Sequence, residues 1–169
     1  MSIFVKKLAM TSKNGPPELD AIDTQLLTIL AQDARLSYAD MGKKLFMSQG
    51  AVHSRVKKLM DAKLIKVISA ELDYAMLGFD VTAFLGIYLE KSNMYDFVKA
   101  EMKKIPEIVD AHYTTGTYSI FAKVICRDTD HLRDILANKI QNINGIQRTE
   151  TFISLEETLA RPLLLAKID

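Results

Sequence analysis

The stretch SYADMGKKLFMSQGAVHSRVKKLMDAKLIK, residues 37–66, decides how the first half of the chain folds. Ser37 and Ser48 are each placed to cap a helix, because a serine oxygen can accept from the backbone N–H groups of a first helical turn. The short turn Phe46-Met47-Ser48 joins the two predicted helices and keeps them close together. Apolar residues recur at helical spacing in both, and they are Tyr38, Met41, Leu45, Val52, Val56 and Leu59. This pattern predicts a helix-turn-helix.

Residues on either side of this stretch extend the predicted domain. Asp20 can cap an earlier helix, whose apolar residues are Ile22, Leu26, Ile29 and Leu30. After the third helix, residues 66–72 favour a β-strand, which would be the wing of a winged helix-turn-helix. The opening arm, residues 1–17, ends in Asn14-Gly15-Pro16-Pro17, a run that breaks regular structure. We expect this arm to lie outside the domain core.

The third predicted helix carries a local excess of positive charge on a chain whose net charge is only +1. Residues 43–66 hold seven basic side chains and one acidic one. A solvated helical face would show the same charge, so the arrangement of the residues must decide. Gly50 and Ala51 are small and lie near the start of the helix, where a recognition helix enters the major groove. We therefore predict double-stranded DNA as a partner.

The predicted DNA contacts differ in the part of the duplex that each side chain suits. The residues predicted to reach base edges are Gln49, His53, Ser54 and Arg55. The residues predicted to contact phosphates or the DNA backbone are Lys43, Lys44, Ser48, Lys57 and Lys58. His53 can equally be an ordinary surface histidine, and the sequence leaves that alternative open.

The second half of the chain has a different periodicity, which predicts a β-α-β-β-α-β order. Apolar residues alternate in 81–89 and again in 118–126, as in half-buried strands. Strands are also predicted at 108–114 and 146–153, and helices follow the first and third strands. A duplicated β-α-β unit folds into a ferredoxin-like sheet with both helices on one face. The predicted fold class is α+β, a winged helix-turn-helix followed by a ferredoxin-like domain.

The domain boundaries follow from these shifts in pattern. We predict an arm at 1–17, a DNA-binding domain at 18–72, a hinge at 73–80, a ferredoxin-like domain at 81–155 and a C-terminal tail at 156–169. The sheet face that the helices leave open carries Phe84, Tyr88 and Phe121. An uncovered apolar face of this size usually pairs with a partner, which predicts a homodimer.

The composition excludes several other classes of protein. No apolar run is long enough to cross a bilayer, and residues 1–10 lack the features of a signal peptide. The single cysteine, Cys126, and the eight methionines suit a reducing cytoplasm, and the scattered histidines predict no metal site or cofactor. Asp128, Asp130, His131 and Asp134 lie close together, but on an exposed first helical turn, where acids favour the helix dipole. We predict that the protein is not an enzyme.

Four segments together make the chain resemble the Lrp/AsnC family, the leucine-responsive and asparagine-responsive regulators. These are LDAIDTQLLTILAQDARLSYADMGKKL (19–45), SQGAVHSRVKKLMDAKLIK (48–66), AHYTTGTYSIFAKVICRD (111–128) and IQRTETFISLEE (146–157). The last two are similar to the asparagine-responsive branch. The resemblance implies a sequence-specific transcription regulator whose second domain binds a free amino acid. It also implies dimers that form through the sheets and commonly assemble into octamers.

The resemblance also implies where the amino acid binds, namely where dimers meet, around the loop between the second and third strands and the last strand. The implied contacts are Tyr113, Thr114, Thr115, Gly116, Tyr118, Ser119, Thr149, Glu150 and Thr151. Gly116 would let the backbone approach a carboxylate, the threonines offer hydroxyls, and Glu150 could meet an ammonium group. A plain glycine hairpin with β-favouring threonines would have the same sequence.

One position departs from the family pattern. Many members have Asp where this chain has Ser119, and a serine cannot neutralise the ammonium group of a ligand. The asparagine-like branch also has Ser there, so asparagine is the favoured effector. An alternative function is a nucleoid-type architectural protein that binds many DNA sites without a strict effector.

Overall fold

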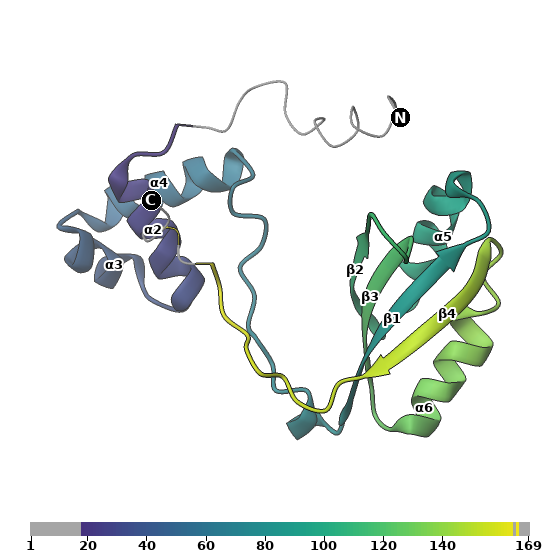
Figure 1. Cartoon of the computed structure of the whole chain (residues 1–169). Helices are drawn as coiled ribbons and strands as arrows, with labels where there is room; N and C mark the ends of the chain where they lie inside the picture. The colour runs from purple at the N-terminus through teal and green to yellow at the C-terminus, as the bar shows by residue number, and fades with distance from the viewer. Residues whose placement is uncertain (1–17, 164, 166–169) are drawn as a thin grey trace. The chain divides into compact units, whose positions relative to one another are not determined.

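The computed structural model describes residues 18–163 and 165, so the predicted arm at 1–17 lies outside the described residues. The chain divides into two compact units (Figure 1). One unit holds the described residues up to Glu71 and those from Ala160 onward, and the other holds Leu72–Leu159. The first is helical and the second combines helices with a sheet, as expected of an α+β chain.

Three helices form the first unit: α2 (Ala21–Gln32), α3 (Tyr38–Leu45) and α4 (Gln49–Asp61). Their predicted caps are confirmed: the side chains of Asp20, Ser37 and Ser48 accept from backbone N–H groups in the first turns. The predicted apolar faces pack together into a core in which five side chains are at most 2% exposed, namely Leu26, Met41, Val52, Val56 and Leu59. The helix-turn-helix prediction is therefore confirmed.

The turn between α3 and α4 contains an unusual residue, Phe46. Its backbone is left-handed, with φ 54° and ψ 43°, and its side chain is 98% exposed. A side chain with a Cβ is disfavoured in this region, and glycine or asparagine is the usual choice at a helix end. Because the ring is exposed within its own unit, its burial does not offset this backbone strain.

Phe46→Asn is therefore expected to stabilise the helical unit by about 0.5–1 kcal/mol, because asparagine tolerates the left-handed backbone. Denaturant unfolding followed by circular dichroism measures the change. Phe46→Ala keeps a Cβ without the amide and serves as the control, with stability close to that of the parent. A loss of stability in Phe46→Asn would contradict the exposed position of the ring.

The predicted wing strand is wrong. Residues 66–72 form neither helix nor strand, and their apolar side chains are exposed, Val67 by 71% and Leu72 by 53%. Their composition favours extended backbone, but a strand also needs a neighbour for its backbone hydrogen bonds. No strand of the described chain pairs with them.

The second unit confirms the predicted β-α-β-β-α-β order. Its strands are β1 (Val81–Leu89), β2 (Ile108–Tyr113), β3 (Ile120–Cys126) and β4 (Ile146–Ile153). Its helices are α5 (Tyr95–Met102) and α6 (Thr129–Asp134), and α6 continues as the π-helical η3 (Ile135–Ile140). Short 3-10 turns, η1 (Ala75–Leu77) and η2 (Ser92–Met94), lie in the predicted hinge and before α5. The strands run antiparallel in the order β2-β3-β1-β4.

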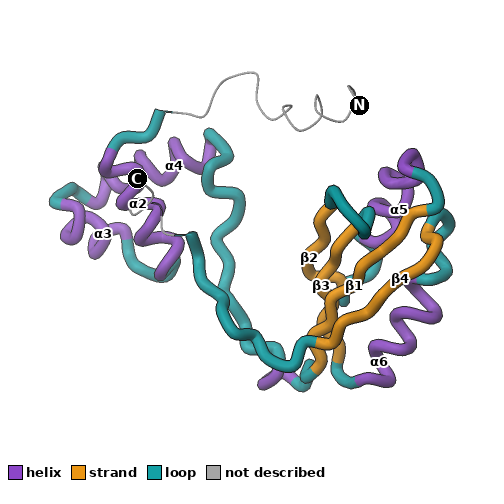
Figure 2. Tube along the Cα trace, viewed as in Figure 1, coloured by secondary structure: helices purple, strands orange, loops and turns teal. Residues whose placement is uncertain are grey.

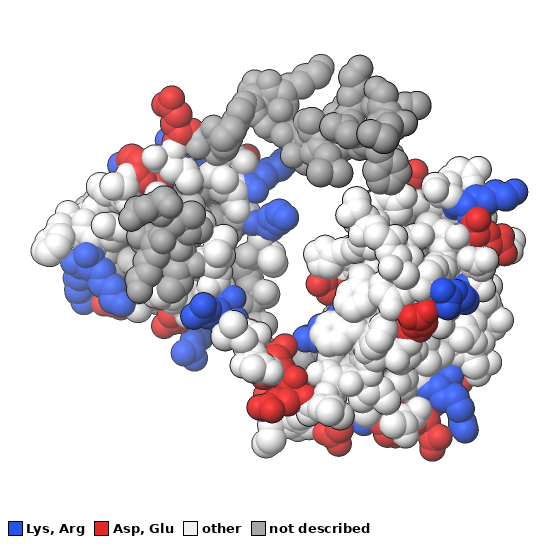
Figure 3. Space-filling view, viewed as in Figure 1, with Lys and Arg blue, Asp and Glu red and all other residues white. Residues whose placement is uncertain are grey.

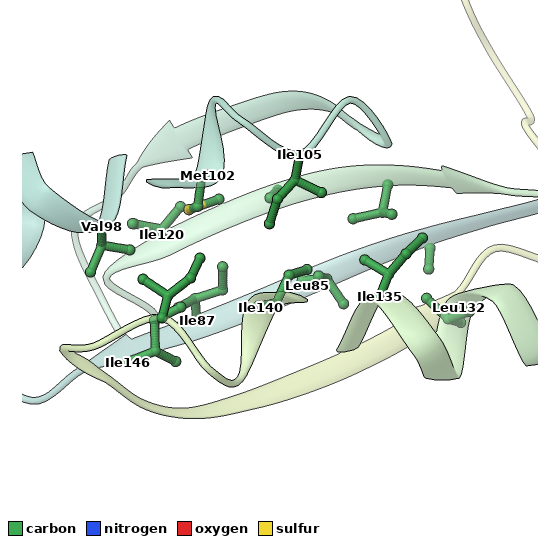
Figure 4. Packing of buried hydrophobic residues seen from close by; sticks show 14 of the residues in the cluster. Leu85, Ile87, Val98, Met102, Ile105, Ile120, Leu132, Ile135, Ile140 and Ile146 are labelled. Atoms are coloured by element: carbon green, nitrogen blue, oxygen red, sulfur yellow. The ribbon is translucent and has the colours of Figure 1, made fainter. Parts of the chain in front are cut away.

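The core of this unit lies between the sheet and its helices, which cover one face (Figure 2). Leu85 and Ile87 of β1 are fully buried there, and they pack with Val98 of α5 and Ile135 and Ile140 of η3 (Figure 4). The other face of the sheet remains uncovered by elements of its own unit. Within the part of the chain that the structure describes, no helix is long and apolar enough to cross a membrane.

Candidate functional site

The first candidate surface is the outer side of α4 with the end of α3. All but one of the predicted DNA contacts are exposed there, and they are Lys43, Lys44, Ser48, Gln49, His53, Ser54, Lys57 and Lys58. Lys and Arg side chains are visible on this unit in Figure 3. Among the residues that the structure describes, nothing lies within 4 Å of a Cβ added at Gly50, so they leave the start of α4 open. The helix start is therefore free to approach a partner closely.

Two of these side chains have neighbours within the unit. Lys43 Nζ lies 2.8 Å from Asp40 Oδ1 in an exposed ion pair, and this hydrogen bond is the main reason why the pKa of Asp40 is lowered. An exposed pair of this kind is weak and can exchange for a phosphate. The ring of His53 meets Tyr38 edge to face, with 5.6 Å between centroids, so Tyr38 orients His53 at the surface.

Arg55 is half-buried and forms ion pairs with two acids at the start of α2. Its Nη1 lies 2.7 Å from Asp20 Oδ2 and 2.6 Å from Asp23 Oδ1, and Asp23 is only 2% exposed. The pKa of Asp20 is lowered, first by the backbone N–H of Asp23 and then by Arg55. Arg55 therefore joins α4 to the start of α2, and its contact with a base edge stays a prediction. The sequence pattern missed this pair because the acids lie more than thirty positions away.

The second candidate site is the loop between β2 and β3, residues 114–119. Thr114 Oγ1 donates to the carbonyl of Tyr118 at 2.6 Å, and Thr114 N donates to the carbonyl of Ser119 at 3.0 Å. Gly116 has φ 119°, a conformation that side chains rarely adopt, and a Cβ there would meet nothing within 4 Å. Glycine at 116 thus serves the backbone turn and also leaves the loop open to a ligand.

Tyr118 leaves this loop and crosses the open face of the sheet. Its ring lies directly on Gly86 of β1, where an added Cβ would approach ring carbons to 2.4 Å. Its hydroxyl donates to Glu150 Oε2 at 2.7 Å, and the hydroxyl of Tyr88 donates to Glu150 Oε1 at 3.0 Å. Arg148 adds an ion pair to Glu150 at 2.8 Å.

The carboxylate of Glu150 is therefore already occupied. The hydrogen bond from Tyr118, followed by that from Tyr88, lowers its pKa, and the same hydrogen bond raises the pKa of Tyr118. The expectation that Glu150 meets the ammonium group of a ligand stays a prediction, and a ligand there would share the carboxylate with Tyr118, Tyr88 and Arg148. Within one chain, Glu150 anchors the aromatic side chains on the open face.

The predicted ligand contacts of β4 divide between the two faces of the sheet. Glu150 pairs with Gly86, and the flanking Thr149 and Thr151 pair with Ile87 and Leu85. Because successive side chains of a strand point to opposite faces, the two threonines lie on the helix side. Gln141 Nε2 contacts Thr149 Oγ1 there at 3.4 Å. The predicted set is thus not gathered into one pocket by a single chain.

The open face itself is an aromatic surface. Phe84 stacks with Phe121 at 5.8 Å between centroids, and Tyr118 lies 5.3 Å from Tyr88 and 6.2 Å from Phe152. The prediction of an apolar face from Phe84, Tyr88 and Phe121 is confirmed. Phe152 and Tyr118 also belong to it; the alternation of β4 could have indicated Phe152, but nothing in the pattern of the loop indicated Tyr118. The surface over the strands is largely uncharged (Figure 3).

Family models match both units. An AsnC-type helix-turn-helix domain matches residues 19–60, and an Lrp/AsnC ligand binding domain matches residues 82–164. The chain is 40% identical to the regulatory protein AsnC of Haemophilus influenzae over 145 residues, which cover 86% of this chain and 97% of that protein. The chain belongs to the Lrp/AsnC family. The structure of Escherichia coli AsnC is also similar, with a TM-score of 0.81 at 38% identity over 88% of this chain and 99% of that one.

The family agrees with the class of protein that the sequence predicts. Lrp/AsnC proteins are transcription regulators with a DNA-binding helix-turn-helix and a ligand-binding domain. The fold also agrees with that of a Neisseria meningitidis transcriptional regulator solved as an L-Met complex, with a TM-score of 0.81 at 19% identity over 85% of this chain and 94% of that one. Asp128, one of the clustered acidic residues, caps α6 by accepting from His131 N at 2.7 Å. Burial raises the pKa of Cys126 to about 11, so this thiol is protonated at neutral pH.

Proposed function

We propose that this Lrp/AsnC regulator recognises specific double-stranded DNA through the start of α4 and changes its activity or assembly when it binds a free amino acid. The observation that carries the proposal is the exposed, small and polar start of α4 beside four lysines on the same unit. A cytoplasmic location is part of the proposal.

The DNA contacts in this proposal follow the exposed side chains. Gln49, His53 and Ser54 would read base edges, because they lie on the first two turns of the helix that enters the groove. The proposed backbone contacts are Lys43, Lys44, Ser48, Lys57 and Lys58. Arg55 takes a supporting role, because its ion pairs with α2 orient α4.

Lys57→Ala is expected to weaken binding to every DNA sequence by a similar factor and to reduce the salt slope by about 0.9 per lost contact. Gln49→Ala is expected to cost about 1–3 kcal/mol on the preferred sequence only. Both are measured by titrating a promoter fragment and a scrambled fragment at several salt concentrations. Lys91→Ala, on the second unit, is the control. Parental affinity and parental salt slope in both α4 variants would refute the assignment.

The proposed ligand is an amino acid, with asparagine favoured because Ser119 offers a neutral acceptor in place of a carboxylate. The proposed contacts are those that the sequence predicts in the loop 113–119 and in β4, except that Glu150 supports Tyr118 instead of meeting the ligand. Since Thr149 and Thr151 lie on the other face from Glu150, we propose that a second copy completes the site. This requires a homodimer through the aromatic face and a further assembly, with an octamer as the proposed form.

The same DNA titration, repeated with and without asparagine at fixed salt, tests the response to the amino acid. A shift in affinity or in the stoichiometry of binding on the promoter fragment supports a regulated, sequence-specific protein. Equal binding to promoter and scrambled DNA, unaffected by any of the twenty amino acids, would instead support the architectural alternative.

A further inference from the structure

A cavity of about 280 Å³ lies between α5 and β2, at the edge of the sheet. Its floor is apolar and is formed by core residues, among them Met102 and Ile120, which lie near each other in Figure 4. The Tyr95 and Tyr113 rings line the cavity and lie 4.1 Å apart between centroids. Its volume is close to that of sites that hold small organic molecules.

The rim of this cavity carries two lysines, and Asp110 and His112, whose side chains contact each other at 3.0 Å, also line it. Lys99 and Lys103 both line it, and they lie four positions apart, so they share one side of the helical turn. Lys99 Nζ lies 5.6 Å from the centre of the Tyr95 ring. Among residues 18–163 and 165, neither ammonium group forms an ion pair with a carboxylate, whereas the adjacent Lys104 pairs with Glu101 at 2.6 Å.

The strand side of the cavity is formed by β2. β2 lies at the edge of the sheet and pairs only with β3, so the backbone groups on its outer side point away from the sheet. Ala111 pairs with Ala122, whose side chain is in the core, so Ala111 faces the helix side and its small side chain leaves the cavity open. An apolar floor and two lysines at the rim define the ligand chemistry.

We propose that this cavity binds a small amphipathic monocarboxylate, of the class of branched 2-oxo acids. The apolar chain lies on Met102 and Ile120, and the carboxylate lies between Lys99 and Lys103. A 2-oxo acid suits the cavity better than an amino acid, because an ammonium group would add a third cation beside the two lysines, and the carboxylate of Asp110 already contacts His112. The cavity is lined by residues of one chain, and it shares Tyr113 with the amino-acid site proposed at the loop 113–119.

The test is calorimetric titration of the full chain with sodium 4-methyl-2-oxopentanoate. We expect saturable binding with one site per chain. The double variant Lys99→Met, Lys103→Met is expected to bind at least about tenfold more weakly, because charge-assisted hydrogen bonds are lost. Ala111→Phe should also weaken binding by filling the cavity, and circular dichroism checks that each variant is folded. Lys104→Met is the matched control and should bind as the parent does.

Two further probes test the ligand class. The neutral 4-methylpentanamide keeps the apolar chain but not the charge and should bind at least about tenfold more weakly. Leucine adds an ammonium group and should also bind more weakly at this site. The proposal is overturned if the parent shows no saturable binding at millimolar concentration. That result is expected if a second copy of the chain covers the β2 edge. Unchanged affinity in the double variant, or leucine binding there as tightly as the oxo acid, would overturn it too.

Discussion

Replacing Gly42 with valine is expected to abolish DNA binding while the second unit stays folded. Gly42 is buried in α3, and a Cβ there would lie 2.5 Å from the carbonyl oxygen of Met47. The backbone N–H of Met47 donates to the carbonyl of Gly42 at 2.8 Å, so the turn rests directly on this glycine. The obstacle is backbone, so a side-chain rotation cannot relieve it.

Gly42→Val is expected to lower the free energy of unfolding of the helical unit by up to about 3 kcal/mol, the upper part of the usual range for overpacking. A unit of this size has a small free energy of unfolding, so a loss of this magnitude is a large part of it. The turn must open, which moves α4 away from α3, and affinity for a promoter fragment should fall at least about 100-fold. Fragment titration and thermal unfolding measure the two effects.

Gly50→Ala is the matched control for stability, because its Cβ meets open space. Its unfolding midpoint should equal or slightly exceed that of the parent, since alanine favours helix more than glycine does. If Gly42→Val keeps parental stability and parental affinity, then the close packing of the turn on α3 is not what positions the proposed recognition helix.

Gly86→Val is expected to dissociate the proposed dimer. A Cβ at Gly86 would occupy the place of the Tyr118 ring, at 2.4 Å from its carbons, and Tyr118 must swing away. That movement breaks the 2.7 Å hydrogen bond to Glu150 and separates Tyr118 from Phe121. In a symmetric dimer the substitution is present in both subunits, so the loss of dimerisation free energy is counted twice. With about 2 kcal/mol lost per subunit, the dissociation constant should rise about 1,000-fold.

Light scattering over a range of protein concentrations measures this change, and circular dichroism checks that the chain remains folded. Tyr118→Phe separates the ring from its hydroxyl: it keeps the ring on Gly86, and the assembly should stay close to that of the parent. The dimer proposal fails if the parent is a monomer at micromolar concentration, or if folded Gly86→Val assembles as tightly as the parent.

Local sequence patterns were sufficient for the helices, for the four strands of the sheet and for their order. Ser37 and Ser48 begin helices because a hydroxyl close to the first turn satisfies its free N–H groups, whatever the rest of the chain does. Alternation in residues 81–89 likewise determined which side chains of β1 enter the core. These effects act between residues that are close together in the chain, so the local sequence is sufficient to predict them.

Only the tertiary structure decided which residues far apart in the sequence pair with each other. A wing strand at 66–72 requires a neighbouring strand, which no local pattern can show to be present. Arg55 has the position of a base-reading residue in α4, but folding brings it to Asp23, and a buried carboxylate requires a charged partner.

In the candidate ligand site, too, the sequence determined some features and the tertiary structure decided others. The sequence by itself determined that Gly116 would lie in a loop and that threonines would flank Glu150 in a strand. Only the tertiary structure decided that Tyr118 reaches over Gly86 to Glu150, and that Thr149 and Thr151 face the opposite side. The physical reason is that a side chain's partners depend on strand order and register, and these are set by packing between segments far apart in the chain.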